Sequence, residues 1–146
     1  MKKLIYGFLA IDVVIFAILA MNGGLKPPKY DLKPAAFQEA VEAGGFLVDV
    51  RTPSEYEDVY IPGATLVNWK GDEFATKIQK YDKSKPIYIY CRSGMRASRA
   101  KRKMNKLGFK EVYNLKGGLK AWAKEKLPVK AKNGFDINAG EGGEGC

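Results

Sequence analysis

Histidine is absent from this chain of 146 residues, and cysteine occurs only twice. The lack of histidine excludes Ser-His-Asp and Cys-His catalytic groups and removes the commonest metal ligand. Two cysteines, Cys91 and Cys146, are too few for a structural zinc site or a framework of disulfides. We therefore expect no metal and no cofactor, and a cysteine nucleophile would have to be activated by backbone groups and arginines.

Negative charge is also scarce, since 16 Asp and Glu residues stand against 25 Lys and Arg residues, for a net charge of +9. Nucleic acid is a common partner of such basic proteins. The sequence contains no helix-turn-helix, zinc-finger or aromatic RNA-reading motif, so we do not expect nucleic-acid binding. A positive field that attracts small anions to a site is the interpretation that the clustered arginines favour.

The N-terminal segment has the pattern of a targeting signal. Two lysines precede an apolar run at residues 4–21, which only Asp12 interrupts. A basic start followed by an apolar stretch is typical of a secretory signal, and as a helix this run would reach roughly 28 Å, close to the thickness of a bilayer core. We predict a cleaved signal peptide or a retained membrane anchor in residues 1–22, then a linker at 23–29. Either alternative exports the rest of the chain to the periplasm or another extracytoplasmic compartment.

Residues 30–130 alternate between helical and strand-like patterns, which indicates an α/β domain with a largely parallel sheet of about five strands and helices on both faces. Ligands of such domains bind beyond the carboxyl ends of the strands, and Cys91 directly follows the clearest strand pattern. The Gly- and Glu-rich residues 131–146 are expected to form a flexible tail. The expected strands are 46–50, 65–68, 87–90 and 111–115, and the expected helices are 34–43, a brief helix opened by a capping box at 52–55, then 74–80, 97–107 and 119–123.

The segment with the clearest chemistry is the loop Cys91-Arg92-Ser93-Gly94-Met95-Arg96, between a strand and a helix. The N–H groups of such a loop and the positive end of the helix form a cradle for an anion, which stabilises a cysteine thiolate without histidine. Gly94 lets the loop curl. The arginines add positive charge and forked donors for oxyanions. An inert, buried Cys91 is the structural alternative, whereas for Arg99 and residues 101–103 a solvated helix face is the simpler interpretation.

This loop resembles the six-residue active loop of rhodanese-type sulfurtransferases, and the resemblance extends over about residues 30–127. One departure stands at Val59-Tyr60, where the family often has Gly-His, and we expect a structural role for that position. The flanking segments that resemble the family are Leu47-Val48-Asp49-Val50-Arg51, Glu55-Tyr56, Ile61-Pro62-Gly63-Ala64, and Val112-Tyr113-Asn114-Leu115-Lys116-Gly117-Gly118 with Trp122.

The resemblance implies a single-domain rhodanese-like sulfurtransferase that works through a persulfide. The Cys91 thiolate would attack the outer sulfur of thiosulfate or a similar donor and release sulfite. Substrate-binding residues would be Arg92, Ser93, Gly94, Met95 and Arg96: their backbone N–H groups would hold the persulfide, and the two arginines would bind the sulfonate end of the donor. A thiol, cyanide or a protein acceptor would then take the sulfur. Asp49 and Arg51 are interpreted as a structural ion pair.

Two other functions use the same loop. A non-enzymatic persulfide carrier or redox interaction module would pass sulfur to a protein partner. A cysteine-dependent phosphatase needs five residues between cysteine and arginine, whereas only four separate Cys91 from Arg96. Cys146 has either no role or, as a hypothesis, that of a resolving thiol, an acceptor or a link between two chains.

Overall fold

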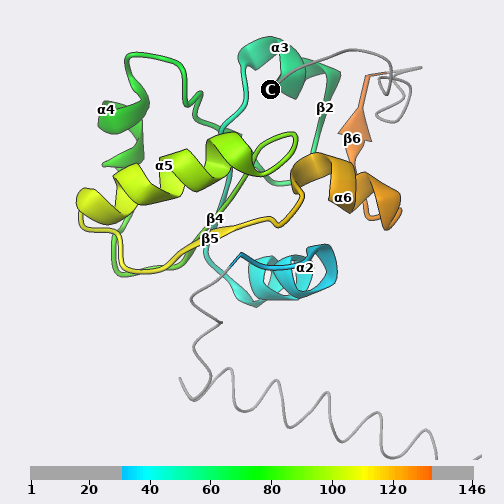
Figure 1. Cartoon of the computed structure of the whole chain (residues 1–146), viewed down its shortest axis with the longest axis horizontal. Helices are drawn as coiled ribbons and strands as arrows, with labels where there is room; N and C mark the ends of the chain where they lie inside the picture. Colours follow the sequence, from blue (N-terminus) through cyan, green and yellow to red (C-terminus); the bar gives the residue numbers. More distant parts are fainter. Residues whose placement is uncertain (1–30, 133–146) are drawn as a thin grey trace, which may run out of the picture.

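The computed structural model describes residues 31–132, and its centre is a parallel sheet of four strands in the order β3-β1-β4-β5. All three neighbouring pairs are parallel, and a single parallel bridge joins Leu32 to Leu115 beside β5. The predicted α/β fold with a largely parallel sheet is confirmed (Figure 1). The strands are β1 (Phe46–Asp49), β3 (Thr65–Leu66), β4 (Ile87–Tyr90) and β5 (Val112–Asn114).

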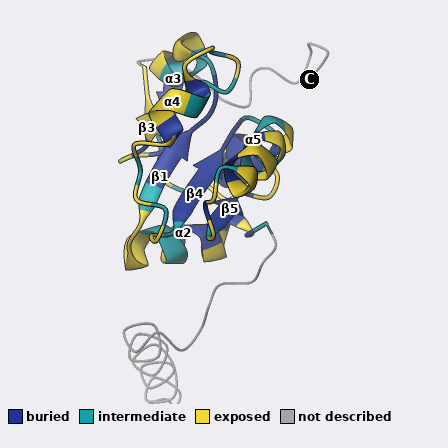
Figure 2. Ribbon diagram, turned by 90° about the vertical axis from the view of Figure 1, so that its left-hand side faces the viewer, coloured by how far each residue is buried: buried dark blue, intermediate teal, exposed yellow. Residues whose placement is uncertain are grey.

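The two faces of the sheet carry different cores because side chains alternate along each strand. Ile87 and Ile89 of β4 face an aliphatic cluster together with Cys91. Tyr88 and Tyr90 face the opposite cluster, which is rich in aromatic side chains. Helices cover both faces, so the strands are buried between them (Figure 2). The helices are α4 (Phe74–Ile78) and α5 (Met95–Lys106) on the Cys91 face, and α2 (Pro34–Ala43) and α6 (Gly118–Lys124) on the other.

A second, two-stranded sheet lies outside the predicted pattern. The strand β2 (Val59–Tyr60) pairs antiparallel with β6 (Lys130–Ala131), and Lys132 N–H donates to the carbonyl of Asp58 at 2.8 Å. These contacts attach residues up to Lys132 to the domain, two residues past the expected boundary. Val59-Tyr60, the segment that departs from the family pattern, thus forms backbone pairs with the end of the domain.

The predicted targeting segment and most of the predicted tail, residues 1–30 and 133–146, lie outside the described residues. Between residues 31 and 132 no helix has the length and apolar character needed to cross a membrane. Signal cleavage, membrane anchoring and export therefore stay predictions.

A buried ion pair joins the end of β1 to the smaller sheet. The Asp49 carboxylate accepts hydrogen bonds from Arg51 Nε at 3.0 Å and from Nη2 at 2.6 Å, and both side chains are almost fully buried. Arg51 also donates to the carbonyl of Val59 in β2. Burial by itself lowers the pKa of Arg51, but the hydrogen bonds and charge of Asp49 outweigh it, so the pKa is raised. The expected ion pair is thus present, and it connects β1 of the central sheet to β2 of the smaller sheet.

We predict that Arg51→Ala lowers the free energy of unfolding by about 3–5 kcal/mol, because it leaves the Asp49 carboxylate buried without a partner. Urea denaturation followed by circular dichroism measures this loss. The double variant D49V/R51M removes both charges and should lose less than the single variant. A double variant that is at least as unstable as Arg51→Ala would contradict this account of the pair.

Candidate active site

The loop predicted to carry the chemistry joins the carboxyl end of β4 to the first turn of α5. Cys91 follows β4 directly, and its side chain is fully buried. Its Sγ accepts a hydrogen bond from the backbone N–H of Gly94 at 3.0 Å. Gly94 is the N-cap of α5 with φ +95°, a left-handed conformation that glycine adopts without steric cost. The turn at Gly94 therefore brings the beginning of the helix to the sulfur.

The α5 helix makes the surroundings of the sulfur electropositive. The first N–H groups of a helix have no acceptor within the helix, and the helix dipole places partial positive charge at this end. In α5 the first backbone bond that closes a helical turn runs from Ser98 N–H to the carbonyl of Gly94 at 2.9 Å. The first turn contains Arg96 and no acidic residue. The N-terminal end of a helix is a common position for bound anions and for reactive cysteines in proteins.

The N-terminal end of α6 holds the opposite side of the loop. Backbone N–H groups of Leu119 and Lys120 donate to the carbonyls of Cys91 and Arg92 at 2.9 and 3.1 Å. Gly118 has φ +62°, and a Cβ atom there would lie 2.5 Å from both of these carbonyl oxygens. This clash explains why glycine occupies position 118 of the Gly117-Gly118 motif. Only a residue without a side chain allows α6 to approach the loop so closely.

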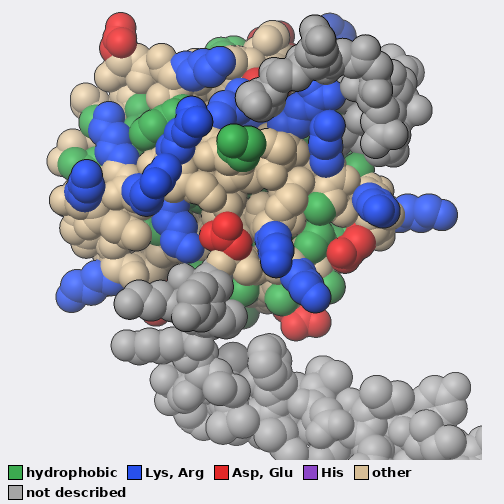
Figure 3. Space-filling model, viewed as in Figure 1, with side chains coloured by type: hydrophobic (Ala, Val, Ile, Leu, Met, Phe, Trp, Pro, Cys, Tyr) green, Lys and Arg blue, Asp and Glu red, His purple; other side chains and the backbone are tan. Residues whose placement is uncertain are grey.

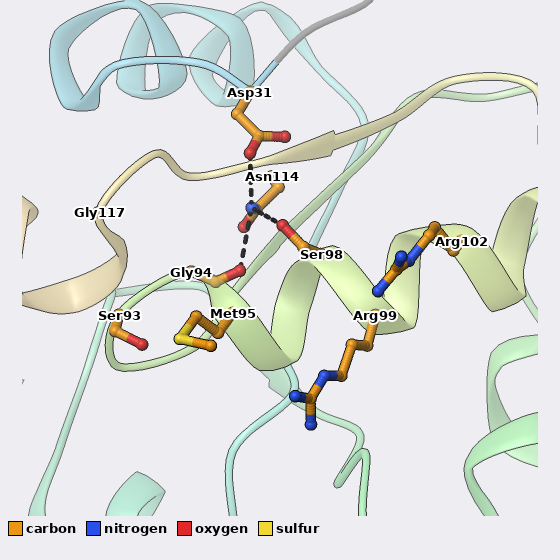
Figure 4. Close-up of a pocket in the computed structure, with 9 residues that line it drawn as sticks. All are labelled: Asp31, Ser93, Gly94, Met95, Ser98, Arg99, Arg102, Asn114 and Gly117. Carbon is orange, nitrogen blue, oxygen red and sulfur yellow. Dashed lines mark hydrogen bonds between the residues drawn. The ribbon is translucent and has the colours of Figure 1, made fainter. Parts of the chain in front are cut away.

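Asn114, at the end of β5, donates a hydrogen bond to the backbone carbonyl of Gly94. Its Nδ2 lies 3.2 Å from the Gly94 carbonyl, 3.0 Å from Asp31 Oδ2 and 3.1 Å from Ser98 Oγ. Figure 4 shows these three contacts converging on the amide. The Asn114 side chain is buried, and its hydrogen bond to the Gly94 carbonyl is buried with it. Gly94 is therefore held through both of its backbone polar groups.

Arg96 is engaged by Glu55, a residue 41 positions away in the chain. Its Nη1 and Nη2 donate to the two carboxylate oxygens at 2.7 and 2.6 Å. Glu55 also accepts from Thr52 N–H at 3.1 Å, a contact of the predicted capping box at the start of α3 (Pro53–Asp58), and from Thr52 Oγ1 at 2.8 Å. Partial burial by itself would raise the pKa of Glu55, but these hydrogen bonds and the Arg96 charge outweigh it and lower the pKa to about 2.

The other predicted substrate-binding residues lie around the mouth of the loop. Arg92 is partly buried and forms no salt bridge with any carboxylate of residues 31–132. Ser93, Gly94 and Met95 line a cavity of 390 Å³ beside the loop. The structure thus brings Gly94 to the sulfur and Arg96 to Glu55. Sulfonate binding by Arg92 and Arg96 stays a prediction.

Burial of Cys91 alone fits either an inert or a reactive cysteine. An N–H donor at hydrogen-bonding distance and the positive end of a helix are the features that favour the reactive interpretation, which stays a prediction. In the part of the chain that the structure describes, no group of three or more His, Cys, Asp or Glu side chains is arranged to hold a metal ion. The chemistry that the arrangement supports is nucleophilic attack by sulfur on an anionic substrate.

Two positioning residues were not identified from the sequence. Glu55 was interpreted only as part of a capping box, and Asn114 only as part of a strand motif. Both lie in segments that resemble the family, and this resemblance was the only sign in the sequence that they could matter for the site. Their link to the loop depends on contacts between residues 20 and 41 positions apart, which no local pattern reveals.

Comparisons with known proteins agree with the fold. The family model for the Rhodanese-like domain matches residues 33–125. The chain is 38% identical over 86 residues to the uncharacterized protein YqhL of Bacillus subtilis, covering 59% of this chain and 64% of that protein. It is 35% identical over 77 residues to the thiosulfate sulfurtransferase GlpE of Coxiella burnetii, covering 52% of this chain and 69% of that one.

A solved structure with the same fold is the rhodanese-like domain of the Alr3790 protein from Anabaena sp., with a TM-score of 0.64 and 25% sequence identity. The similarity covers 82% of this chain and 89% of that domain. The chain spans less than two thirds of the length of the Bacillus relative. The shared unit is thus the domain that carries the Cys91 loop.

We predict that Gly118→Ala disturbs the loop, because its Cβ would overlap the carbonyls of Cys91 and Arg92. The expected loss of stability is about 1–3 kcal/mol, and alkylation of Cys91 by iodoacetamide should become several-fold faster as the loop opens. Gly63→Ala is the matched control, since Gly63 has φ +85° but no atom within 4 Å of an added Cβ. Equal alkylation rates in the two variants would show that α6 does not hold the loop.

We predict that Glu55→Gln lowers the free energy of unfolding at pH 7 by about 1–3 kcal/mol, because the ionised carboxylate accepts charge-assisted hydrogen bonds. The pKa of Glu55 is lowered from 4.5 to about 2. Its contribution is therefore complete above pH 4.5 and is lost as the pH falls toward 2, so the difference between wild type and variant should shrink over this range. Urea denaturation at several pH values measures this.

The matched control for Glu55→Gln is Glu73→Gln. Glu73 pairs with Lys77 at 2.7 Å, but both side chains are exposed. Water and salt screen such a pair, so its removal should cost much less. Equal losses in the two variants at pH 7 would contradict the special role of the Glu55–Arg96 contact.

Proposed function

This chain belongs to the rhodanese-like domain family, a family of sulfurtransferases, and we propose that it transfers sulfane sulfur through a persulfide on Cys91. The observation that carries the proposal is the position of Cys91 Sγ, 3.0 Å from the Gly94 N–H at the positive end of α5. This position supports a negative charge on Sγ in the thiolate that attacks the donor. A relative named thiosulfate sulfurtransferase supports thiosulfate as the donor.

In the first step, the Cys91 thiolate attacks the outer sulfur of thiosulfate. A new S–S bond forms at Cys91, the S–S bond of thiosulfate breaks, and sulfite leaves with the bonding electron pair. We assign the sulfonate end of the donor to Arg92, which has no salt bridge within residues 31–132. Arg96, whose charge Glu55 partly offsets, is held at the first turn of α5 and is assigned a second contact with the sulfonate.

In the second step, an acceptor removes the outer sulfur. Cyanide or a thiolate attacks that sulfur, the S–S bond to Cys91 breaks, and Cys91 leaves as a thiolate. Cyanide becomes thiocyanate, and a thiol becomes a persulfide. Because the donor's product leaves before the acceptor reacts, ping-pong kinetics are expected.

A persulfide carrier that releases sulfur only to one partner is the second candidate. The complete burial of Cys91 supports it, because a shielded persulfide is protected from small thiols. Rapid turnover of thiosulfate with cyanide would favour the enzyme, whereas a stable persulfide with negligible turnover would favour the carrier. The phosphatase alternative ranks below both, since only four residues separate Cys91 from Arg96.

We predict that thiosulfate treatment adds about 32 Da to the intact mass of the protein. The Cys91→Ser variant should show no gain, and Cys146→Ser should retain it, so the pair of variants locates the persulfide. Mass spectrometry under non-reducing conditions measures the change. A gain that survives in Cys91→Ser, or release of phosphate from p-nitrophenyl phosphate by the untreated protein, would refute the proposed function.

A further inference from the structure

One exposed side of α5 carries a row of positive charge that begins at the catalytic loop. The buried residues of the helix are Ala97, Ala100 and Met104. The exposed residues recur every three or four positions on another side, as the period of a helix requires. We call this set the α5 stripe: Met95, Arg99, Arg102, Lys103 and Lys106.

The charges of the α5 stripe are not neutralised by carboxylates of the described residues, although Lys103 lies over the rings of Trp69 and Phe74. Within residues 31–132, none of its four cations forms a salt bridge. Arg99 and Lys103 are like charges four positions apart, as are Arg102 and Lys106, and such pairs destabilise a helix. Figure 3 shows Lys and Arg side chains gathered over this part of the surface. The stripe therefore concentrates positive charge at a cost to the helix.

Two adjoining hollows follow the α5 stripe away from the loop, and Arg99 and Arg102 line both of them. The first is the 390 Å³ cavity that Ser93, Gly94 and Met95 share. The second has a volume of 720 Å³ and extends to Trp69, Lys103 and Lys106. Lys103 lies over the ring of Trp69 at 5.6 Å, which fixes that side of the hollow. A ligand that occupies both hollows would run along the helix and end at the loop.

Met95 gives the α5 stripe an apolar end beside the reactive sulfur. Its side chain is 52% exposed, and it is the one large hydrophobic residue exposed between residues 31 and 132. It directly follows Gly94, whose N–H contacts Cys91 Sγ. An exposed methionine flanked by cations suits a protein partner, because interfaces commonly combine an adaptable apolar anchor with a charged rim.

We propose that the α5 stripe docks an acidic segment of the protein that accepts the sulfur, with an apolar residue of that segment on Met95. This inference rests on the proposed function and names its acceptor. The stripe spans about 16 Å along the helix, longer than a small thiol but matched by about five residues of extended chain. A nucleic acid would match the charge but supplies no acceptor thiol.

The docked partner completes the second step of the reaction. Its cysteine thiolate attacks the outer sulfur of the Cys91 persulfide and forms a new S–S bond. The bond to Cys91 breaks, and Cys91 keeps the electron pair as a thiolate. The partner leaves with a persulfide, and neither an oxidant nor a reductant is consumed.

The probes are two fluorescent peptides that share one cysteine and one leucine. Four further positions are Glu in the acidic peptide and Gln in the neutral one. Binding to the full chain with Cys91→Ser, measured by fluorescence anisotropy at low salt, tests docking without chemistry. We expect R102E/K106E to weaken binding of the acidic peptide at least tenfold. The matched variant K80E/K124E changes the same net charge at exposed lysines outside the stripe and should weaken it less than twofold.

Kinetics with Cys91 present separate docking from catalysis. R102E/K106E should retain the wild-type kcat at saturating thiosulfate and cyanide, with any loss of anion attraction confined to KM, but lose at least tenfold in kcat/KM for the acidic cysteine peptide relative to the neutral one. If the wild-type protein neither turns over cyanide nor forms a persulfide, the proposed function is refuted. The binding of the acidic peptide to the α5 stripe would still be valid. Wild-type turnover with no difference between the two peptides would refute the docking surface alone.

Other occupants of the α5 stripe give different results. Equal weakening by R102E/K106E and K80E/K124E, or tighter binding of a single-stranded oligonucleotide than of the acidic peptide, would overturn the proposal. Residues 133–146 contain Asp136, Glu141, Glu144 and Cys146. If the tryptic peptide that begins at Asn133 gains about 32 Da in wild type but not in R102E/K106E, this segment of the chain is the occupant, and the partner protein is excluded.

Discussion

The site depends on a single residue, Gly94, whose backbone N–H and carbonyl both form hydrogen bonds. Its N–H points at Cys91 Sγ, and its carbonyl accepts from Asn114 and from the first turn of α5. α6 fixes the preceding carbonyls of Cys91 and Arg92. The strand β5 and the helices α5 and α6 thus hold one short turn. Because protein interiors are closely packed, the sulfur has little freedom to move away from its donor.

The Glu55–Arg96 contact changes how the charge of the loop should be understood. Arg96 lies in the first turn of α5, but an ionised carboxylate offsets much of its positive charge. The stabilisation of a sulfur anion therefore depends more on backbone N–H groups and the helix dipole than the number of arginines suggests. Arg92, without such a partner within residues 31–132, keeps its full charge for a substrate.

Local patterns predicted most of the fold. The strand at 87–90 has the bounds expected from its apolar run, whereas α5 begins at Met95 rather than Ala97 because Gly94 serves as its N-cap. The β2–β6 pair was missed since each strand has two residues and their pairing links distant parts of the chain. The loop residues were identified from their types and order. The roles of Glu55 and Asn114 arise only when folding brings distant segments together.

The different cores on the two faces of the sheet have an optical consequence. Trp122 is buried with Phe37 on the aromatic face, and its indole N–H donates to the carbonyl of Pro128. Trp69 packs on the opposite face beside Phe74, with Lys103 over its ring. With one tryptophan on each side, emission from single-tryptophan versions of the protein would report separately on the face that carries the reactive sulfur and on the face that carries α2 and α6.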